Sequence, residues 1–113
     1  YKRNLVWRDG ITLWRDVVGK SPEKDRGHIN LGRAYAIAGL FDEAEQEFKK
    51  VLSLKPDDGI MYYNLGVVYE EKGLADKAMA AYAEALRLEP NNQKAIEALG
   101  TLGSRMDRVP PIR

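Results

Sequence analysis

The sequence predicts an all-α fold, a solenoid of antiparallel helix pairs, and two observations support this. The first is a constant period, because Pro22, Pro56 and Pro90 are evenly spaced and both 56 − 22 and 90 − 56 give 34. The second is that residues of one kind recur in phase between the prolines, at positions 32 and 66, 39 and 73, 44 and 78, and 48 and 82. Such self-similarity is typical of stacked helical repeats.

The turn residues place six helices. We expect them at about 4–19, 25–38, 41–54, 59–72, 75–88 and 93–106. Gly39 and Gly73 can adopt the left-handed conformation that ends a helix. The segments Pro-Asp-Asp at 56–58 and Pro-Asn-Asn at 90–92 stop one helix and cap the next. Because Pro110 and Pro111 fall within it, the stretch 108–113 is expected to be an extended tail.

Small and aromatic residues define the expected core. The small ones let two helices approach closely where they cross, and the aromatic ones fill the wider gaps beside the crossings. The small set is Gly32, Ala44, Gly66 and Ala78, and the aromatic set is Tyr35, Phe48, Tyr69 and Tyr82.

The same pattern resembles the tetratricopeptide repeat family, in which Leu-Gly, Tyr, Gly, Ala, an aromatic residue and a closing Pro occur at these offsets. The resemblance implies a right-handed α-solenoid with two full repeats, 25–58 and 59–92. An N-terminal half-repeat helix and a C-terminal capping helix would flank them, so that 1–107 forms a single domain. Trp14 fits the first of these helices, because it lies one full period before Phe48.

Composition excludes several classes of function. The 113 residues include 18 basic and 17 acidic ones and no cysteine, so the bulk charge does not favour nucleic acid, and thiolate chemistry and cysteine zinc sites are absent. The glycines follow the repeat and no strand precedes them, which excludes a phosphate-binding loop. We therefore expect no enzyme, no cofactor, no metal and no nucleic acid partner.

Two features that might suggest chemistry have a structural interpretation. His28 lies where the repeat packs a large side chain between helices, and a lone histidine has no nucleophile or co-ligand to work with. We interpret Asp42, Glu43, Glu45 and Glu47 as a solvated helix start, with Glu45 positioned to pair with Lys49 four residues later.

The first helix of each repeat lines the hollow face of such a solenoid, and there we predict a groove for a peptide or a partner helix. Asn30 and Asn64 lie one repeat apart, and an amide can both donate to and accept from a peptide main chain. Local hydrogen bonding of the two amides is the alternative. The predicted groove residues are Arg26, Asn30, Arg33, Ile60, Tyr63, Asn64, Val67 and Lys94, bordered by Ile29 and Thr101.

Two further resemblances bear on this groove. The in-phase asparagines are similar to the ladder that holds a peptide main chain in the enzyme that transfers N-acetylglucosamine to Ser and Thr. The basic clamp of chaperone-binding family members is incomplete here, because Ile29 and Val67 stand where that clamp needs polar groups. The comparison therefore disfavours a chaperone tail as the ligand.

The first helix also carries an apolar face that one neighbouring helix cannot cover completely. We expect it to form a homo-oligomer or to contact a preceding domain. A structural or oligomerisation domain that uses the exposed faces of its terminal helices is thus the alternative to a peptide-binding groove. The residues of this predicted self-association face are Val6, Trp7, Ile11, Leu13, Trp14 and Val17.

The start of the chain suggests a larger parent protein, because the first residue is Tyr1 and not Met. The segment from Arg3 to Pro22 resembles the junction that follows the last membrane helix in bacterial membrane proteins with glycosyltransferase-like cores. That resemblance implies an acceptor-recruiting domain outside the cytoplasm with a membrane-anchored parent, and a cytoplasmic location is the alternative. We expect no membrane contact by the fragment itself, since no apolar run reaches about 20 residues.

Overall fold

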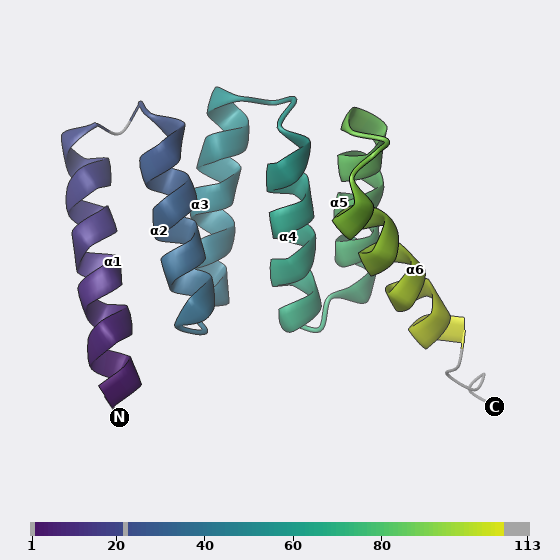
Figure 1. The fold of residues 1–113 in the computed structure, drawn as a ribbon, viewed down its shortest axis with the longest axis horizontal. Helices are drawn as coiled ribbons and strands as arrows, with labels where there is room; N and C mark the ends of the chain where they lie inside the picture. Colours follow the sequence, from purple (N-terminus) through teal and green to yellow (C-terminus); the bar gives the residue numbers. More distant parts are fainter. Residues whose placement is uncertain (1, 22, 108–113) are drawn as a thin grey trace. The chain divides into compact units, whose positions relative to one another are not determined.

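The computed structural model describes residues 2–21 and 23–107, with side chains described within 10–21 and 23–104. All regular structure in this part of the chain is helical, as the sequence predicts. The predicted tail, 108–113, lies outside the described residues. The helices are α1 (Lys2–Lys20), α2 (Asp25–Ile37), α3 (Phe41–Leu54), α4 (Gly59–Glu71), α5 (Ala75–Leu88) and α6 (Gln93–Asp107) (Figure 1).

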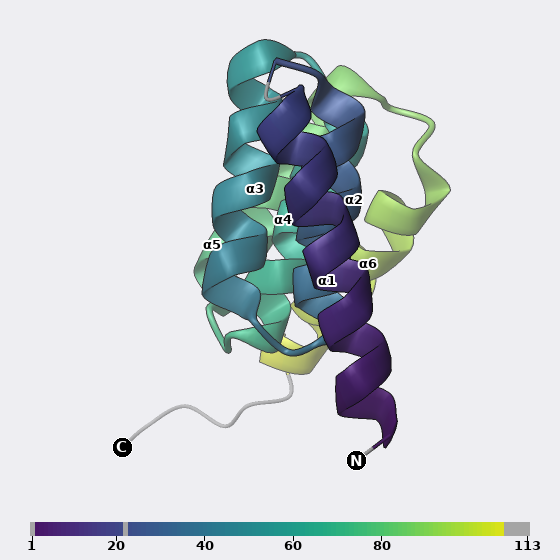
Figure 2. The ribbon, with the colours of Figure 1, turned by 90° about the vertical axis from the view of Figure 1, so that its left-hand side faces the viewer.

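The helices group into two compact units, Tyr1–Asp57 and Asp58–Arg113. In the first unit α2 packs against both α1 and α3, and Figure 2 shows α1 running beside α2. In the second unit α5 packs against both α4 and α6. That 1–107 behaves as one domain stays a prediction.

The turn inside each repeat has the geometry predicted for its glycine. Gly39 and Gly73 have φ angles of 82° and 78°, in the left-handed region that side chains rarely adopt. The N–H of Leu40 donates to the carbonyl of Tyr35 at 2.8 Å, and the N–H of Leu74 donates to that of Tyr69 at the same distance. These bonds satisfy carbonyls that the helix end would otherwise leave unpaired.

Two helices begin with the predicted side-chain caps. The carboxylate of Asp58 accepts a hydrogen bond from the N–H of Met61 at 3.2 Å. The amide oxygen of Asn92 accepts one from the N–H of Ala95 at 3.1 Å. Each cap supplies an acceptor to an N–H that has no partner within its own helix.

An ion pair ties the start of α2 to the end of α3. The ammonium of Lys55, the residue after α3, lies 2.9 Å from the carboxylate of Asp25, the first residue of α2. The hydrogen bond from Lys55 lowers the pKa of Asp25 below its ordinary value. The contact is largely solvated, so we assign it little weight in stability.

Glycine and aromatic residues interlock within each helix pair, as the sequence predicts. A Cβ placed on Gly32 would lie 2.6 Å from Cε1 of Phe48, and one on Gly66 would lie 2.5 Å from Cδ1 of Tyr82. Both rings are buried, and the small residue Ala78 near the second crossing is fully buried. The close approach of α2 to α3 and of α4 to α5 therefore depends on glycine.

Candidate functional site

The lone histidine belongs to the core, where it meets a carboxylate that the sequence interpretation placed in solvent. His28 on α2 is 4% exposed, and its Nδ1 lies 2.7 Å from Oε1 of Glu47 on α3, which is 7% exposed. The ammonium of Lys50 lies 3.0 Å from the other carboxylate oxygen of Glu47. The prediction for Glu47 was wrong because this residue lies on the side of α3 that faces α2, where a buried carboxylate needs partners.

Two residues of that acidic segment and one ion pair agree with the prediction. Asp42 and Glu43 are exposed in the first turn of α3. The carboxylate of Glu45 lies 2.8 Å from the ammonium of Lys49, which confirms the expected pair four residues apart. Asp42 and Glu43 thus form a solvated helix start, whereas the side chain of Glu45 is half-buried, at 14% exposure.

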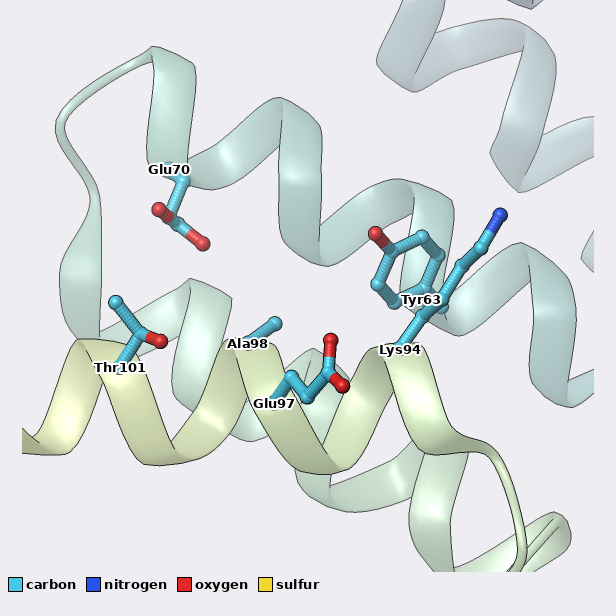
Figure 3. Close-up of a pocket in the computed structure, with 6 residues that line it drawn as sticks. All are labelled: Tyr63, Glu70, Lys94, Glu97, Ala98 and Thr101. Atoms are coloured by element: carbon cyan, nitrogen blue, oxygen red, sulfur yellow. The ribbon is translucent and has the colours of Figure 1, made fainter.

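A pocket of about 400 Å³ opens between α4 and α6 in the second unit. Figure 3 shows side chains of α4 facing those of α6 across it. Its wall is mixed in chemistry, with two carboxylates, one ammonium, a phenol and a hydroxyl around a small apolar patch. The lining residues are Tyr63, Glu70, Lys94, Glu97, Ala98 and Thr101.

A buried tyrosine holds one of the two carboxylates of the pocket. The hydroxyl of Tyr82 on α5 donates to Oε1 of Glu70 at 2.6 Å, and its ring centroid lies 5.7 Å from that of Tyr63. Burial raises the pKa of Tyr82 strongly, and the hydrogen bond to Glu70 raises it further. Through Tyr82, α5 therefore contacts the pocket wall at both Glu70 and Tyr63.

Sequence reasoning missed both of these polar pairs, although the repeat contains a signal for each. The second repeat has Tyr62 and Ala81 in phase with His28 and Glu47, so the two polar residues occur together or not at all. Likewise the first repeat has Ala36 and Phe48 in phase with Glu70 and Tyr82, so the carboxylate occurs together with the hydroxyl that donates to it. Paired differences between repeats therefore mark contacting residues.

The structure brings some of the predicted groove residues together. Tyr63 and Lys94 both line the pocket, as does Thr101, which was expected at the border. On the same helix as Tyr63, Ile60 and Val67 are exposed at 55% and 36%. These residues form a surface of the second unit that ligands can reach.

The remaining groove residues lie mostly on α2 in the first unit. Arg26 and Arg33 are exposed, and Ile29 and Asn30 are half-buried, as is Asn64 on α4. Local hydrogen bonding of the side-chain amides of Asn30 and Asn64 stays the alternative interpretation. A groove that includes both asparagines stays a prediction.

The predicted self-association face is partly exposed in the described residues. Leu13 is 56% exposed, while Ile11, Trp14 and Val17 are half-buried. A γ-carbon of Val17 lies 3.4 Å from the position of a Cβ on Gly27 of α2, so this valine already has a neighbour. The side chains of Val6 and Trp7 lie outside the described residues.

Residues 2–21 and 23–107 contain neither a metal-binding cluster nor a membrane-spanning helix. In that part of the chain no three His, Asp or Glu side chains are grouped so that they could hold a metal ion. There, too, no helix combines the length and the apolar character needed to cross a bilayer.

Comparison with known families decides the classification. A family model described as Tetratricopeptide repeat matches residues 2–59 and 38–93. The chain belongs to the tetratricopeptide repeat family. The matches span both units, and with the six helices they confirm the predicted fold, a tetratricopeptide helical-repeat solenoid.

Solved tetratricopeptide structures share the fold at low sequence identity. The first tetratricopeptide domain of Spaghetti (RPAP3), solved with an HSP90 peptide, has a TM-score of 0.83 and 20% identity, over 95% of this chain and 85% of that chain. YrrB, described as having an unusual peptide-binding site, has a TM-score of 0.79 and 24% identity, over 81% of this chain and 47% of that one. At these identities the likeness shows the fold alone.

The tetratricopeptide repeat chain is also similar to a short part of a curated relative. Protein O-mannosyl-transferase Tmtc1 of Drosophila melanogaster is 36% identical over 56 residues, which are 50% of this chain. The chain spans only 6% of the length of that protein. The likeness therefore concerns a repeat segment of the relative.

Proposed function

We propose that this tetratricopeptide repeat chain is a protein-interaction module that binds an extended peptide along the first helices of its repeats. The observation that supports the proposal is the pocket between α4 and α6, which Tyr63 and Lys94, two of the predicted groove residues, both line. Members of the family that share the fold are described with a bound HSP90 peptide and with a peptide-binding site.

The surface around the pocket suits an extended peptide. Asn64 follows Tyr63 in sequence, and its amide can both donate to and accept from a main chain. Ile60 and Val67 lie four residues before and three residues after Asn64, so they share its side of α4 and present exposed apolar area to peptide side chains. Asn30 holds the equivalent position on α2, and we include it in the proposed groove for that reason.

The charges of the pocket favour one type of ligand side chain. Glu70 and Glu97 contribute two carboxylates and Lys94 one ammonium, so the lining is negative on balance. A Lys or Arg side chain of the peptide can lay its aliphatic stem along Tyr63 and Ala98 and place its charge between the carboxylates. We therefore propose a basic residue as the side chain that the pocket receives.

The groove is tested with peptides selected from a random display library and titrated against the chain by fluorescence polarisation. Asn64→Ala should weaken binding by about fivefold to thirtyfold, because the amide makes one or two hydrogen bonds of about 1 kcal/mol each. Asn91→Ala is the matched control, since Asn91 is exposed in the turn before α6 and should have no effect. Equal affinity for wild type and for an Asn30→Ala, Asn64→Ala double variant would rule out the groove.

The charge preference has its own test. Glu97→Gln should lower the affinity for peptides that contain Lys or Arg more than the affinity for the same peptides with alanine in that place. Lys94→Gln should raise the affinity for the peptides that contain Lys or Arg. Selected peptides without a basic residue, or affinities that both variants leave unchanged, would contradict the proposed occupant while leaving the groove itself in place.

The proposed role is binding and not catalysis. The lone histidine, the residue most often used for proton transfer, is enclosed with Glu47 in the core of the first unit. The pocket instead combines groups that hold a ligand through charge and hydrogen bonds.

The match to an O-mannosyl-transferase favours a second, finer function, the recruitment of an acceptor protein for a membrane glycosyltransferase-like parent. Acceptors of O-linked sugar carry hydroxyl groups, so selection from a library rich in Ser and Thr should yield binders. A library without Ser and Thr should yield few. Equal yields from the two libraries would remove this function and would leave general peptide binding intact.

A further inference from the structure

The last helix has a glycine with no side chain packed over it, whereas an aromatic ring covers the equivalent glycine in both complete helix pairs. Gly100 follows Gly66 by one period of the repeat, as Gly66 follows Gly32. Gly32 is covered by Phe48 and Gly66 by Tyr82, in each case an aromatic residue of the next helix. A Cβ on Gly100 would meet nothing within 4 Å.

A second position on α6 is also uncovered. Ile96 is in phase with His28, which is 4% exposed against α3, yet Ile96 is 42% exposed. The exposure of Ile96 and the open space at Gly100 show that no described helix covers this face of α6. It consists of one large apolar residue and one bare glycine, and it corresponds to the α2 surface that α3 covers.

The first helix carries the residues that complement this face. Trp14 precedes Phe48 by one period and therefore holds the position of the ring that covers a glycine. Leu13 precedes Glu47 by the same interval, and Glu47 is the residue that contacts His28. Leu13 is 56% exposed in the single chain, whereas Glu47 is buried.

The two terminal helices thus correspond to the two halves of one repeat. Where the complete pair has His28 against Glu47, joining α6 to α1 would set Ile96 against Leu13, two exposed apolar residues. Gly10 fits the same register, because it is in phase with the buried Ala44 and no atom lies within 4 Å of a Cβ placed on it.

We propose that α1 of a second copy of this chain docks on α6, with its Trp14 over Gly100 and its Leu13 against Ile96, in the manner of α3 on α2. The interface is heterologous, since it joins two different surfaces of the same chain. Copies joined in this way form an open chain, or a closed assembly when the free α1 face and the free α6 face meet. This surface is separate from the proposed peptide-binding pocket.

Two charge variants test the arrangement by sedimentation equilibrium. The average mass of wild type should rise with concentration from that of one chain, 12.8 kDa, to that of two or more. Leu13→Glu blocks the α1 face and Ile96→Glu blocks the α6 face, so each variant alone should be monomeric. An equimolar mixture should form dimers and nothing larger, because one intact α1 face and one intact α6 face remain for one contact. Circular dichroism establishes that each variant is folded.

Further variants distinguish this interface from non-specific association. Ile37→Glu is the matched control, because Ile37 is 63% exposed on α2 outside both faces, and it should assemble as wild type does. Gly100→Leu should abolish assembly without lowering the thermal midpoint, since the single chain has open space there. With Trp7→Phe, Trp14 is the only tryptophan, and its emission should shift to the blue as concentration rises.

Three results would overturn the proposal. Wild type that remains monomeric at millimolar concentration removes the interface, and a charge variant that still dimerises on its own indicates a symmetric contact of one face with itself. A mixture of the two charge variants that stays monomeric shows that α1 and α6 do not meet, and a helix of another protein would then be the occupant to seek. None of these results bears on peptide binding.

Discussion

His28 and Glu47 form a buried contact that the second repeat replaces with Tyr62 and Ala81. A carboxylate at 7% exposure needs a partner, and here it has both the histidine and Lys50. The replacement in the second repeat removes the acid and the histidine together. The two positions should therefore be energetically coupled.

This coupling leads to the first prediction. Glu47→Ala alone should lower the free energy of unfolding by about 1–3 kcal/mol, because the ring of His28 loses a buried hydrogen-bond partner. The double variant His28→Tyr, Glu47→Ala copies the second repeat and should recover most of that loss. Urea unfolding followed by circular dichroism gives the coupling energy. Losses that simply add would show that the two residues act independently.

The in-phase glycines give a second prediction, in which the same substitution changes stability in opposite directions at two positions. Gly66→Ala should destabilise the chain by about 1–3 kcal/mol, because the new methyl group overlaps the ring of Tyr82. Gly100→Ala should stabilise it by about 0.5–1 kcal/mol, since alanine is the better helix former and the space is open. Thermal unfolding at low concentration, where self-association is absent, measures both. Equal effects would contradict the packing described for Tyr82.

At the scale of the helices, the ends are determined locally. Asp58 and Asn92 begin α4 and α6 with a side-chain acceptor, and Gly39 and Gly73 end α2 and α4 with a left-handed residue. A helix end that is satisfied within four residues needs no support from distant contacts.

A third prediction concerns these caps. Asp58→Ala and Asn92→Ala should each cost about 1 kcal/mol of stability, the usual value for losing an N-cap. Asp57→Ala is the matched control, because Asp57 is exposed and precedes the cap position, and it should change stability much less. Chemical denaturation measures all three. A loss for Asp57→Ala as large as that for Asp58→Ala would assign the effect to charge and not to capping.

The local nature of these signals explains what the sequence could predict. Helix bounds, turns and caps depend on residues near one another in the chain, and the predicted bounds agree with the structure to within two residues. The buried Glu47 depends on which side of α3 faces α2, which the acidic composition of its surroundings obscured. The pocket depends on the spacing of α4 and α6, and of its residues only Tyr63, Lys94 and the bordering Thr101 were predicted for the groove.

At the scale of the whole molecule, each unit has its own polar contact in the interior. The first unit has His28 with Glu47, and the second has Tyr82 with Glu70. The second contact should make stability fall at alkaline pH, since the pKa of Tyr82 is raised in the folded state.

This dependence is the fourth prediction. Because the folded state holds the phenol proton more tightly than the unfolded chain, the stability is fully present below the ordinary tyrosine pKa of about 10 and falls above it, by up to about 1.4 kcal/mol per pH unit. Tyr82→Phe should remove most of this slope, and Tyr62→Phe, at a half-buried position, should keep it. Urea unfolding at pH values from about 9 to about 11, on either side of the ordinary tyrosine pKa of about 10, measures how stability changes with pH. A slope unchanged in Tyr82→Phe would contradict the assignment.

The division into two units also gives each its own natural spectroscopic reporter. Both tryptophans, Trp7 and Trp14, belong to the first unit, whereas four of the six tyrosines belong to the second. Tryptophan fluorescence thus follows melting of Tyr1–Asp57, and tyrosine absorbance is weighted toward Asp58–Arg113. Without any added label, one heating experiment compares the midpoints of the two signals and measures the cooperativity between neighbouring repeats.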